Sequence, residues 1–112
     1  MSYCLFCNMA ASEIVPNIVF EDDDVLAFHD IAPQAPIHIL IITKKHISTL
    51  NDAEDTLLLG KLMQTAAQLA KKLGVADAGY RTVINCNELG GQAVYHLHIH
   101  FLAGRQMLWS PG

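Results

Sequence analysis

The segment His96-Leu97-His98-Ile99-His100-Phe101 places three of the six histidines of this chain at alternate positions, with apolar residues between them. Alternate side chains of a β-strand point to the same face of a sheet. We therefore expect a strand whose three imidazoles line one face, while the apolar side chains enter a core on the other face. One histidine on such a strand is ordinary, but three in register displace the Thr or Val residues that favour strands and therefore indicate a function.

The spacing of these histidines bears on the kind of site that they form. Same-face Cα atoms along a strand are roughly 6.6 Å apart, and the outer two are roughly 13 Å apart, so one tetrahedral zinc ion is within reach of two neighbours but hardly of all three. An extended anion suits the spacing better, because several imidazoles can meet different phosphate oxygens while one acts as nucleophile or base. The strand therefore predicts a site for phosphate chemistry.

Length and composition limit the classes of protein to consider. With 112 residues, of which 52% are hydrophobic, the chain is expected to form one globular domain over residues 1–112. A net charge of −4 gives no basic surface for non-specific nucleic-acid binding. No run of about 18 apolar residues and no basic leader with an apolar stretch is present, so we expect a cytoplasmic protein that binds no membrane. In that compartment the three cysteines do not indicate a disulfide framework.

A long amphipathic helix is predicted in the middle of the chain. Asn51 or Asp52 is expected to cap it, Glu54 to complete a capping box, and Gly74 to end it. Its apolar stripe consists of Leu58, Leu59, Leu62, Met63, Ala66, Leu69, Ala70 and Leu73. The stripe indicates that the helix packs on a sheet.

Shorter elements are predicted on both sides of this helix. They are a short helix near Cys4–Ser12 and strands near Ile18–Glu21, Val25–His29, Ile37–Ile42 and Arg81–Cys86, followed by the histidine strand. The strand Ile37–Ile42 is too apolar to be exposed and is expected at the centre of the sheet, with both faces covered. The predicted class is α+β, with an antiparallel sheet covered by the long helix.

Several stretches of the sequence resemble the histidine triad (HIT) nucleotide-binding proteins, and in particular their Hint branch. The segment from His96 to Leu102 matches the family signature His-φ-His-φ-His-φ-φ, where φ is apolar. Other matching stretches are Phe28-His29-Asp30-Ile31-Ala32-Pro33-Gln34-Ala35-Pro36, Lys44-Lys45-His46-Ile47, Gly90-Gly91-Gln92 and Gly104-Arg105-Gln106-Met107. Together they cover essentially the whole chain, which makes the resemblance far more specific than a short His-x-His match.

The resemblance implies a fold, an assembly and an activity. The fold is a five-stranded antiparallel sheet with one long and one short helix, and the sheets of two subunits join across a homodimer. The activity is that of a purine nucleoside phosphoramidase, which cleaves P–N bonds in adenosine 5′-phosphoramidates and acts on aminoacyl or lysyl adenylates through a nucleotidyl-histidine intermediate. The ligand would be a purine nucleoside monophosphate or phosphoramidate, and no cofactor would be required for catalysis.

The catalytic set implied by the resemblance consists of His38, His96, His98 and His100. His98 would attack the α-phosphorus through a neutral ring nitrogen, which requires the other nitrogen to carry a proton held by an acceptor such as a backbone carbonyl of the same strand. His100 and His38 would hydrogen-bond the phosphoryl oxygens. Because His38 lies among isoleucines, its imidazole needs a partner whatever its function.

The resemblance also indicates where a nucleotide would bind. Asp30 would accept hydrogen bonds from the ribose hydroxyls, although an Asx turn before Pro33 is an alternative that the residues leave open. The base would contact Leu5, Phe6, Met9, Phe28 and Ile31, which would otherwise be assigned to the core. The phosphate would contact Asn85, Gly91, Gln92 and Ala93, where glycine lets backbone N–H groups approach an anion.

Ala93 departs from the family pattern, because many Hint proteins have a serine at this position. That serine hydroxyl contacts the phosphate or assists the departing amine, and a methyl group does neither. We therefore expect either that another residue or water protonates the leaving group, or that turnover is slower.

Cys4 and Cys7 have the C-x₂-C spacing of a zinc half-site. Some histidine triad proteins complete such a pair with a histidine of the Lys-Lys-His segment and the first triad histidine, which here are His46 and His96. The resemblance thus implies a structural zinc ion, because four protein ligands leave no position for water. The alternative is a pair of inert thiols in a short helix.

Two other functions remain open. A dinucleoside polyphosphate hydrolase of the related Fhit branch would use the same histidines, but the ending from Gly104 to Gly112 resembles the Hint branch. A nucleotide- or zinc-binding interaction protein without turnover is supported only by Ala93. Trp109, which the resemblance places toward the neighbouring subunit's site, would help to select leaving groups or would anchor the interface.

Overall fold

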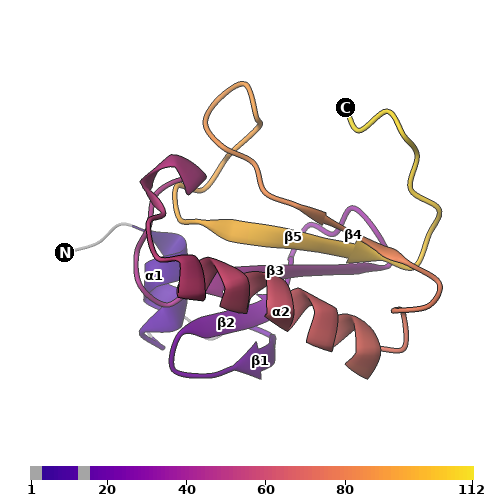
Figure 1. Cartoon of the computed structure of the whole chain (residues 1–112), viewed down its shortest axis with the longest axis horizontal. Helices are drawn as coiled ribbons and strands as arrows, with labels where there is room; N and C mark the ends of the chain where they lie inside the picture. The colour runs from indigo at the N-terminus through magenta and orange to yellow at the C-terminus, as the bar shows by residue number, and fades with distance from the viewer. Residues whose placement is uncertain (1–3, 13–15) are drawn as a thin grey trace.

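The computed structural model describes residues 4–12 and 16–112 and shows one antiparallel sheet of five strands within them (Figure 1). The strands are β1 (Ile18–Glu21), β2 (Val25–His29), β3 (Ile37–Thr43), β4 (Tyr80–Val83) and β5 (His98–Ala103). Their order across the sheet is β1-β2-β3-β5-β4, so the histidine strand lies between β3 and β4. With the two α-helices of the described residues, this confirms the α+β class and the five-stranded sheet.

Strand β3 occupies the centre of the sheet, as its composition predicts. It pairs with β2 on one side and with β5 on the other, and every residue from His38 to Thr43 is buried. Both faces of β3 meet a hydrophobic cluster, so its apolar residues do not need to alternate with polar ones.

Helix α2 (Thr56–Lys72) covers one face of the sheet, and Figure 1 shows it running along the strands. The core between them contains Ile39, Ile41, Ile99 and Phe101 from the sheet and Leu62, Ala66, Leu69 and Ala70 from the helix. Met63, which the sequence assigns to the apolar stripe, is instead 48% exposed. Neither α2 nor any other helix within residues 4–12 and 16–112 is long and apolar enough to span a lipid bilayer.

The opposite face of the sheet carries a smaller core under helix α1 (Leu5–Ala10). Phe6 is the buried residue of this helix, and it packs with Leu26 and Phe28 of β2 and with Leu40 and Ile42 of β3. Because α1 is only six residues long, it covers part of this face, and the triad strand passes beside it.

The start of α2 differs from the sequence prediction, whereas its end agrees. Asp55 is the N-cap, and its Oδ1 accepts a hydrogen bond from the backbone N–H of Leu58. Asn51 and Asp52 lie instead in a short 3₁₀-helix, η1 (Leu50–Asp52), where Thr49 and Asp52 form the capping box that we expected to involve Glu54. Several polar residues in a row can each cap a helix, so the local pattern does not select one. Gly74 follows the last turn with φ of +74°, as predicted.

The bounds of two strands also differ from the prediction. Strand β4 covers Tyr80–Val83 and not Arg81–Cys86, and β5 begins at His98 and not at His96. The register explains the second difference, because His98 pairs with Ile42, next to the end of β3. His96 therefore lies just before the strand, where pairing with β3 does not fix its backbone.

Candidate active site

A cavity of about 630 Å³ opens on the α1 side of the sheet. Its apolar wall contains Leu5, Phe6, Met9, Phe28 and Ile31, and its polar wall contains Asp30, Asn85, Gly91, Ala93, His98 and His100. These predicted site residues come from α1, the ends of β2 and β5, and the loops between strands. The sequence analysis missed five residues that line the cavity. His29 was visible only as part of the matching segment around Asp30, and the other four are Pro16, Asn17, Leu40 and Val94.

Gln92 is a predicted phosphate contact that does not line this cavity. Its side chain is buried, where its amide N–H groups donate to the carbonyl oxygens of Ser48 and Val94. Its side-chain oxygen accepts from the backbone N–H of Asn87. Gln92 therefore braces the loop that carries Gly91 and Ala93.

Glycine is required at two positions of this loop, for different reasons. Gly91 has φ of +84°, a conformation that side chains with a Cβ rarely adopt. A Cβ on Gly90 would lie 2.6 Å from the carbonyl oxygen of Cys86, so only glycine fits there. The loop thus brings its backbone close to the cavity at Gly91 and leaves Ala93 exposed at the wall.

His98 has one ring nitrogen committed to the backbone. Its Nδ1–H donates to the carbonyl oxygen of His96 over 2.6 Å, which is the kind of acceptor expected from the sequence. A neutral imidazole carries one proton, so Nε2 of His98 keeps its lone pair. Burial lowers the pKa of His98, and Phe6 packs edge-on against its ring with centroids 5.1 Å apart. The neutral, nucleophilic form is therefore held in a fixed orientation.

A chain of hydrogen bonds fixes the proton of His100. The backbone N–H of Gln34 donates to His38 Nδ1 over 3.0 Å, so the proton of neutral His38 lies on Nε2. His38 Nε2 is 2.9 Å from His100 Nδ1, and its N–H therefore donates to that atom. The proton of neutral His100 must then lie on Nε2. We call this chain, Gln34 N–H to His38 to His100, the imidazole relay.

The neutral state of the imidazole relay follows from its surroundings. Burial is the main cause that lowers the pKa of His100 to about 4, and the neighbouring His98 and His38 lower it further. Burial also lowers the pKa of His38, against an opposing effect of the Asp30 carboxylate. At neutral pH, His100 is thus an uncharged hydrogen-bond donor at the cavity wall.

Asp30 forms the Asx turn, one of the two alternatives that the sequence left open, and it also lines the cavity. Its Oδ1 accepts from the backbone N–H of Ala32 over 2.8 Å, which is an Asx turn. Its Oδ2 is 3.5 Å from His38 Nε2, and the residue lines the cavity. Ligand atoms of Asp30, His38 and His100 lie within 4.8 Å of one another. The 2.9 Å contact between His38 Nε2 and His100 Nδ1 is within hydrogen-bond distance.

Lowering the pH from 6.5 to 4 is expected to reduce the free energy of unfolding, and His100→Asn is expected to weaken this dependence. The pKa of His100 is about 4 in the folded protein, against an ordinary value of 6.5. In this window the unfolded chain binds more protons at this site, so stability falls as the pH falls, by up to about 1.4 kcal/mol per pH unit. Urea unfolding followed by circular dichroism measures the slope. If the free energy of unfolding changed with pH by the same amount in the wild type and in His100→Asn, the low pKa of His100 would be contradicted.

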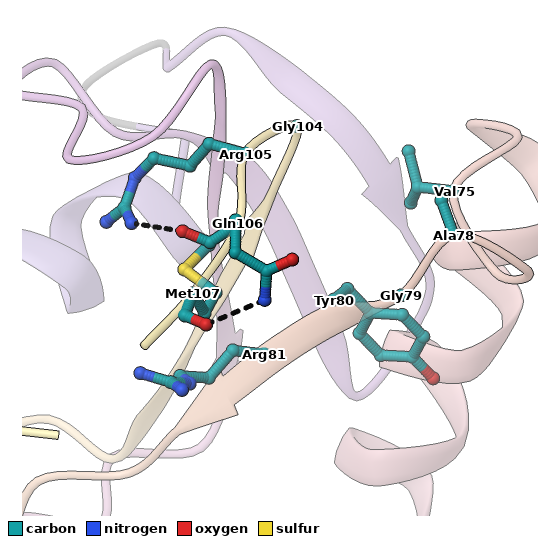
Figure 2. Close-up of a pocket in the computed structure, with 9 residues that line it drawn as sticks. All are labelled: Val75, Ala78, Gly79, Tyr80, Arg81, Gly104, Arg105, Gln106 and Met107. Carbon is teal, nitrogen blue, oxygen red and sulfur yellow. Dashed lines mark hydrogen bonds between the residues drawn. The ribbon is translucent and has the colours of Figure 1, made fainter. Parts of the chain in front are cut away.

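A second cavity, of about 590 Å³, lies between the start of β4 and the segment after β5 (Figure 2). Its lining residues in the described part of the chain include no histidine, cysteine or carboxylate. Arg81 Nη2 donates to the carbonyl oxygen of Leu108, and Arg105 Nε and Nη2 donate to that of Gln34. These arginines hold the chain, and Arg105 fixes the peptide next to the imidazole relay. The first cavity, which contains histidines and a carboxylate, is therefore the candidate active site.

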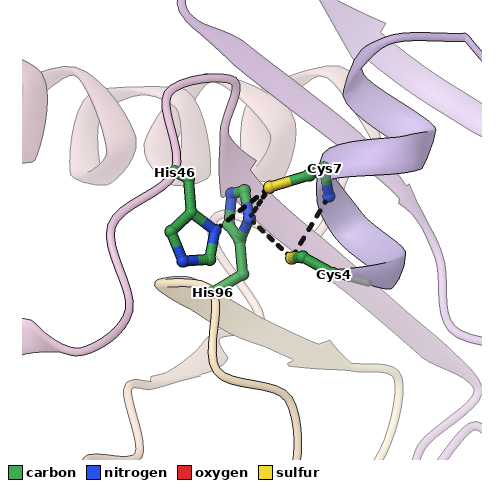
Figure 3. Close-up of side chains that lie close together, drawn as sticks. All are labelled: Cys4, Cys7, His46 and His96. Atoms are coloured by element: carbon green, nitrogen blue, oxygen red, sulfur yellow. Dashed lines mark hydrogen bonds between the residues drawn. The ribbon is translucent and has the colours of Figure 1, made fainter. Parts of the chain in front are cut away.

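Four side chains from three segments meet beside the first cavity (Figure 3). They are Cys4 and Cys7 at α1, His46 after β3, and His96 before β5, and we call them the Cys₂His₂ cluster. His96 Nδ1 is 3.3 Å from both sulfur atoms, and His46 Nδ1 is 3.0 Å from Sγ of Cys7. Sulfur and nitrogen ligands of a tetrahedral zinc ion are about 3.5 Å apart, so the cluster has nearly the size of such a site.

The hydrogen bonds around the Cys₂His₂ cluster also suit a metal. His96 Nε2–H donates to the carbonyl oxygen of Thr43 over 2.5 Å, so a neutral His96 directs the lone pair of Nδ1 toward the sulfur atoms. Burial lowers the pKa of His96, which favours this neutral form. His46 Nε2 lies 3.3 Å from Ser48 Oγ, and its Nδ1 faces Cys7. The four residues therefore fit a closed structural zinc site.

Comparison with known proteins identifies the family of this chain. A family model described as HIT domain matches residues 11–107. The purine nucleoside phosphoramidase of Escherichia coli is 48% identical to the chain over 105 residues, which cover 92% of this chain and 88% of that protein. A HIT family hydrolase from Legionella pneumophila superposes with a TM-score of 0.95 at 54% identity, covering 97% of this chain and 99% of the other. A histidine triad protein from Clostridium difficile superposes with a TM-score of 0.93 at 41% identity, covering 96% of each chain.

The matched region contains the whole sheet and all three triad histidines. The similar structures cover nearly all of this chain and nearly all of their own length, so the likeness extends beyond the motif to the complete fold. This chain therefore belongs to the HIT domain family of hydrolases.

Proposed function

We propose that this protein hydrolyses the P–N bond of purine nucleoside phosphoramidates, with AMP linked to an amine as the model substrate. Aminoacyl or lysyl adenylates, in which the bond that breaks is P–O and a carboxylate leaves, are further candidates. The observation that carries the proposal is His98, which lines a cavity of about 630 Å³ with Nδ1–H bound to a carbonyl and the Nε2 lone pair retained. The name of the Escherichia coli relative, purine nucleoside phosphoramidase, supports the substrate class.

The proposed reaction has two displacements at phosphorus. In the first, His98 Nε2 forms a bond to the α-phosphorus while the P–N bond breaks, and the amine takes up a proton and leaves. In the second, water attacks the phosphorus of the nucleotidyl-histidine and loses a proton to solvent, the bond to His98 Nε2 breaks, and the nucleoside monophosphate is released. His100 Nε2–H is oriented by the imidazole relay to donate to a phosphoryl oxygen, which stabilises the charge that develops there.

The walls of the cavity suggest how the nucleotide is held. Ile31 is 99% exposed at the cavity although it is a large apolar residue, and a purine base packed between Ile31 and Phe28 would remove that surface from water. Asp30 Oδ2 would accept from the ribose hydroxyls, since Oδ1 already accepts from Ala32. The backbone of Gly91 would contact the phosphate.

Ala93 lines the cavity but has no group that can donate a proton. The departing amine must therefore obtain its proton elsewhere, and we propose that water supplies it. This assignment keeps His100 as a hydrogen-bond donor to oxygen in both displacements.

Hydrolysis of an adenosine 5′-phosphoramidate is expected to exceed hydrolysis of diadenosine triphosphate at least about tenfold in kcat/KM. Because the nucleotidyl half is the same in both substrates, the comparison reports on the leaving group. Chromatographic measurement of AMP release gives both rates, and Ala93→Ser in the same assay is expected to be as active as the wild type or more active. Faster cleavage of the triphosphate would favour a dinucleoside polyphosphate hydrolase, and absence of hydrolysis of both would favour a nucleotide-binding protein without turnover.

We also propose that Cys4, Cys7, His46 and His96 hold one zinc ion. The support is the donor set of two thiols and two imidazoles, with contacts of 3.0–3.3 Å between sulfur and nitrogen. When bound, zinc would supply a cross-link between α1 and the sheet and no open coordination position for catalysis.

A homodimer is proposed as the assembly, with β4 as the strand through which two sheets join. The support is that β4 lies at an edge of the sheet and offers an unpaired row of backbone groups. Trp109 follows on the C-terminal segment and is 88% exposed, so a second subunit would find a large aromatic side chain there.

A further inference from the structure

Helix α1 contributes to both the Cys₂His₂ cluster and the nucleotide cavity. Cys4 caps the helix and Cys7 lies in its first turn, and both reach the cluster. Leu5, Phe6 and Met9 of the same helix form part of the apolar wall of the cavity. Any change in how the cysteines are held therefore moves this wall.

Apart from the cluster, the helix is held by the apolar packing of Phe6 and Met9 on the sheet. It has six residues, and helices this short are not stable in isolation. Phe6 is its buried residue, while Leu5 is 43% exposed. The cluster joins the helix to His46 and His96, which follow β3 and precede β5 in the sheet. The cluster is thus a polar attachment of the wall to the sheet.

His96 connects the same cluster to the proposed nucleophile. Its Nδ1 faces both cysteines, while its own carbonyl oxygen accepts the Nδ1–H of His98 over 2.6 Å. Phe6 packs on both rings, with centroid distances of 6.0 Å to His96 and 5.1 Å to His98. A displacement of His96 would therefore disturb the carbonyl that orients His98 and the ring that packs on it.

We propose that the Cys₂His₂ cluster, when it holds zinc, is a positioning site for the hydrolase: it fixes the α1 wall of the nucleotide cavity and the carbonyl that orients His98. The cluster itself touches neither the base nor the phosphorus. The inference rests on the metal site and the reaction proposed above. It requires nucleotide affinity and the order of α1 to depend on zinc, which a remote stabilising metal would not produce.

The test compares zinc-loaded protein with protein treated with a zinc chelator and then reloaded with zinc. AMP is the probe, and its affinity is measured by titration calorimetry. Without zinc, the AMP dissociation constant is expected to rise about tenfold, because the nucleotide must then order the side chains of α1 as it binds. Hydrogen exchange of amides in Leu5–Ala10 is expected to accelerate, while amides in β3 stay protected. Reloading with zinc should reverse both effects.

Cys7→Ser and Cys86→Ser form a matched pair of variants. Cys7→Ser should reproduce the zinc-free state, whereas Cys86→Ser should behave as wild type, since Cys86 lies outside the cluster. If Cys7→Ser fails to fold, the chelated and reloaded wild type decides the question. Equal AMP affinity and equal α1 protection with and without zinc would overturn the proposal, as would metal analysis that finds no zinc in protein purified without chelator.

The test of the positioning role can fail or succeed independently of the test of phosphoramidate hydrolysis. Zinc-dependent AMP affinity and α1 protection without phosphoramidate hydrolysis would support the positioning role and refute the hydrolase. Hydrolysis that does not depend on zinc, with AMP affinity equally independent of it, would support the hydrolase and refute the positioning role.

Discussion

Replacing His98 by alanine is expected to abolish phosphoramidate hydrolysis, with a loss of at least about 10⁴-fold in kcat, while AMP binding is retained. Loss of a nucleophile removes the covalent pathway and leaves only the electrostatic contribution of the remaining site. Binding should survive, because His98 is one of several groups at the polar wall and the apolar wall is unchanged. The measurement is single-turnover kinetics together with AMP titration.

A covalent intermediate gives an independent test of the same role. Wild-type protein stopped with denaturant at neutral or alkaline pH during turnover is expected to carry one nucleotidyl group on the peptide that contains His98, as identified by mass spectrometry. Exogenous imidazole is expected to restore part of the activity of His98→Gly, because it can occupy the space and attack the phosphorus. Full activity of His98→Ala, or a label on another histidine, would show that the nucleophile is misassigned.

Replacing His38 by phenylalanine is expected to lower kcat about 100-fold with little effect on KM. The phenyl ring retains the shape of the His38 side chain, which is buried. It cannot replace the hydrogen bond that His38 Nε2–H donates to His100 Nδ1 over 2.9 Å. Without this donor, the proton of His100 is free to move to Nδ1, and the phosphoryl oxygen loses a hydrogen bond that strengthens in the transition state. Loss of one such donor costs about 10²–10³ in rate.

His38→Gln is the matched control, because its side-chain amide can donate from nearly the position of Nε2. It should recover much of the lost kcat. The ¹⁵N chemical shifts of the imidazole of His100 should report protonation at Nε2 in the wild type and in His38→Gln, and a mixture of the two neutral forms in His38→Phe. Wild-type kcat in the phenylalanine variant would mean that the imidazole relay does not set the state of His100.

The architecture could be predicted because the local pattern of apolar and polar residues indicates which face of each strand is buried. Alternation in the histidine strand placed Ile99 and Phe101 in the core under α2, and His98 and His100 on the other face, as the structure shows. His96, which was expected on the same strand, lies before it. The apolar run of β3 required a central strand for the same reason, since its two faces had to be buried. The prediction was wrong where several neighbouring residues could serve equally well. At the start of α2, for example, Asp55 is the N-cap, whereas the sequence predicted Asn51 or Asp52.

The membership of the site was partly visible in the sequence, but the protonation of its histidines was not. A match to family motifs named most of the residues that line the cavity. It also named Gln92 and His38, which do not line the cavity and whose side chains are buried. Which nitrogen of His38 carries the proton depends on the backbone N–H of Gln34, in a loop that forms only when the strands pair. A hydrogen-bond partner of this kind leaves no trace in residue periodicity.

The sequence by itself determined that the imidazoles of His98 and His100 share a face of the sheet, because a strand repeats every two residues regardless of what surrounds it. Only the tertiary structure decided what each imidazole does. His96 faces two cysteines that precede it by about 90 residues, and His100 meets His38 on a neighbouring strand. These contacts join segments that are distant along the chain, and their geometry depends on how α1 and β3 pack, which no local pattern encodes.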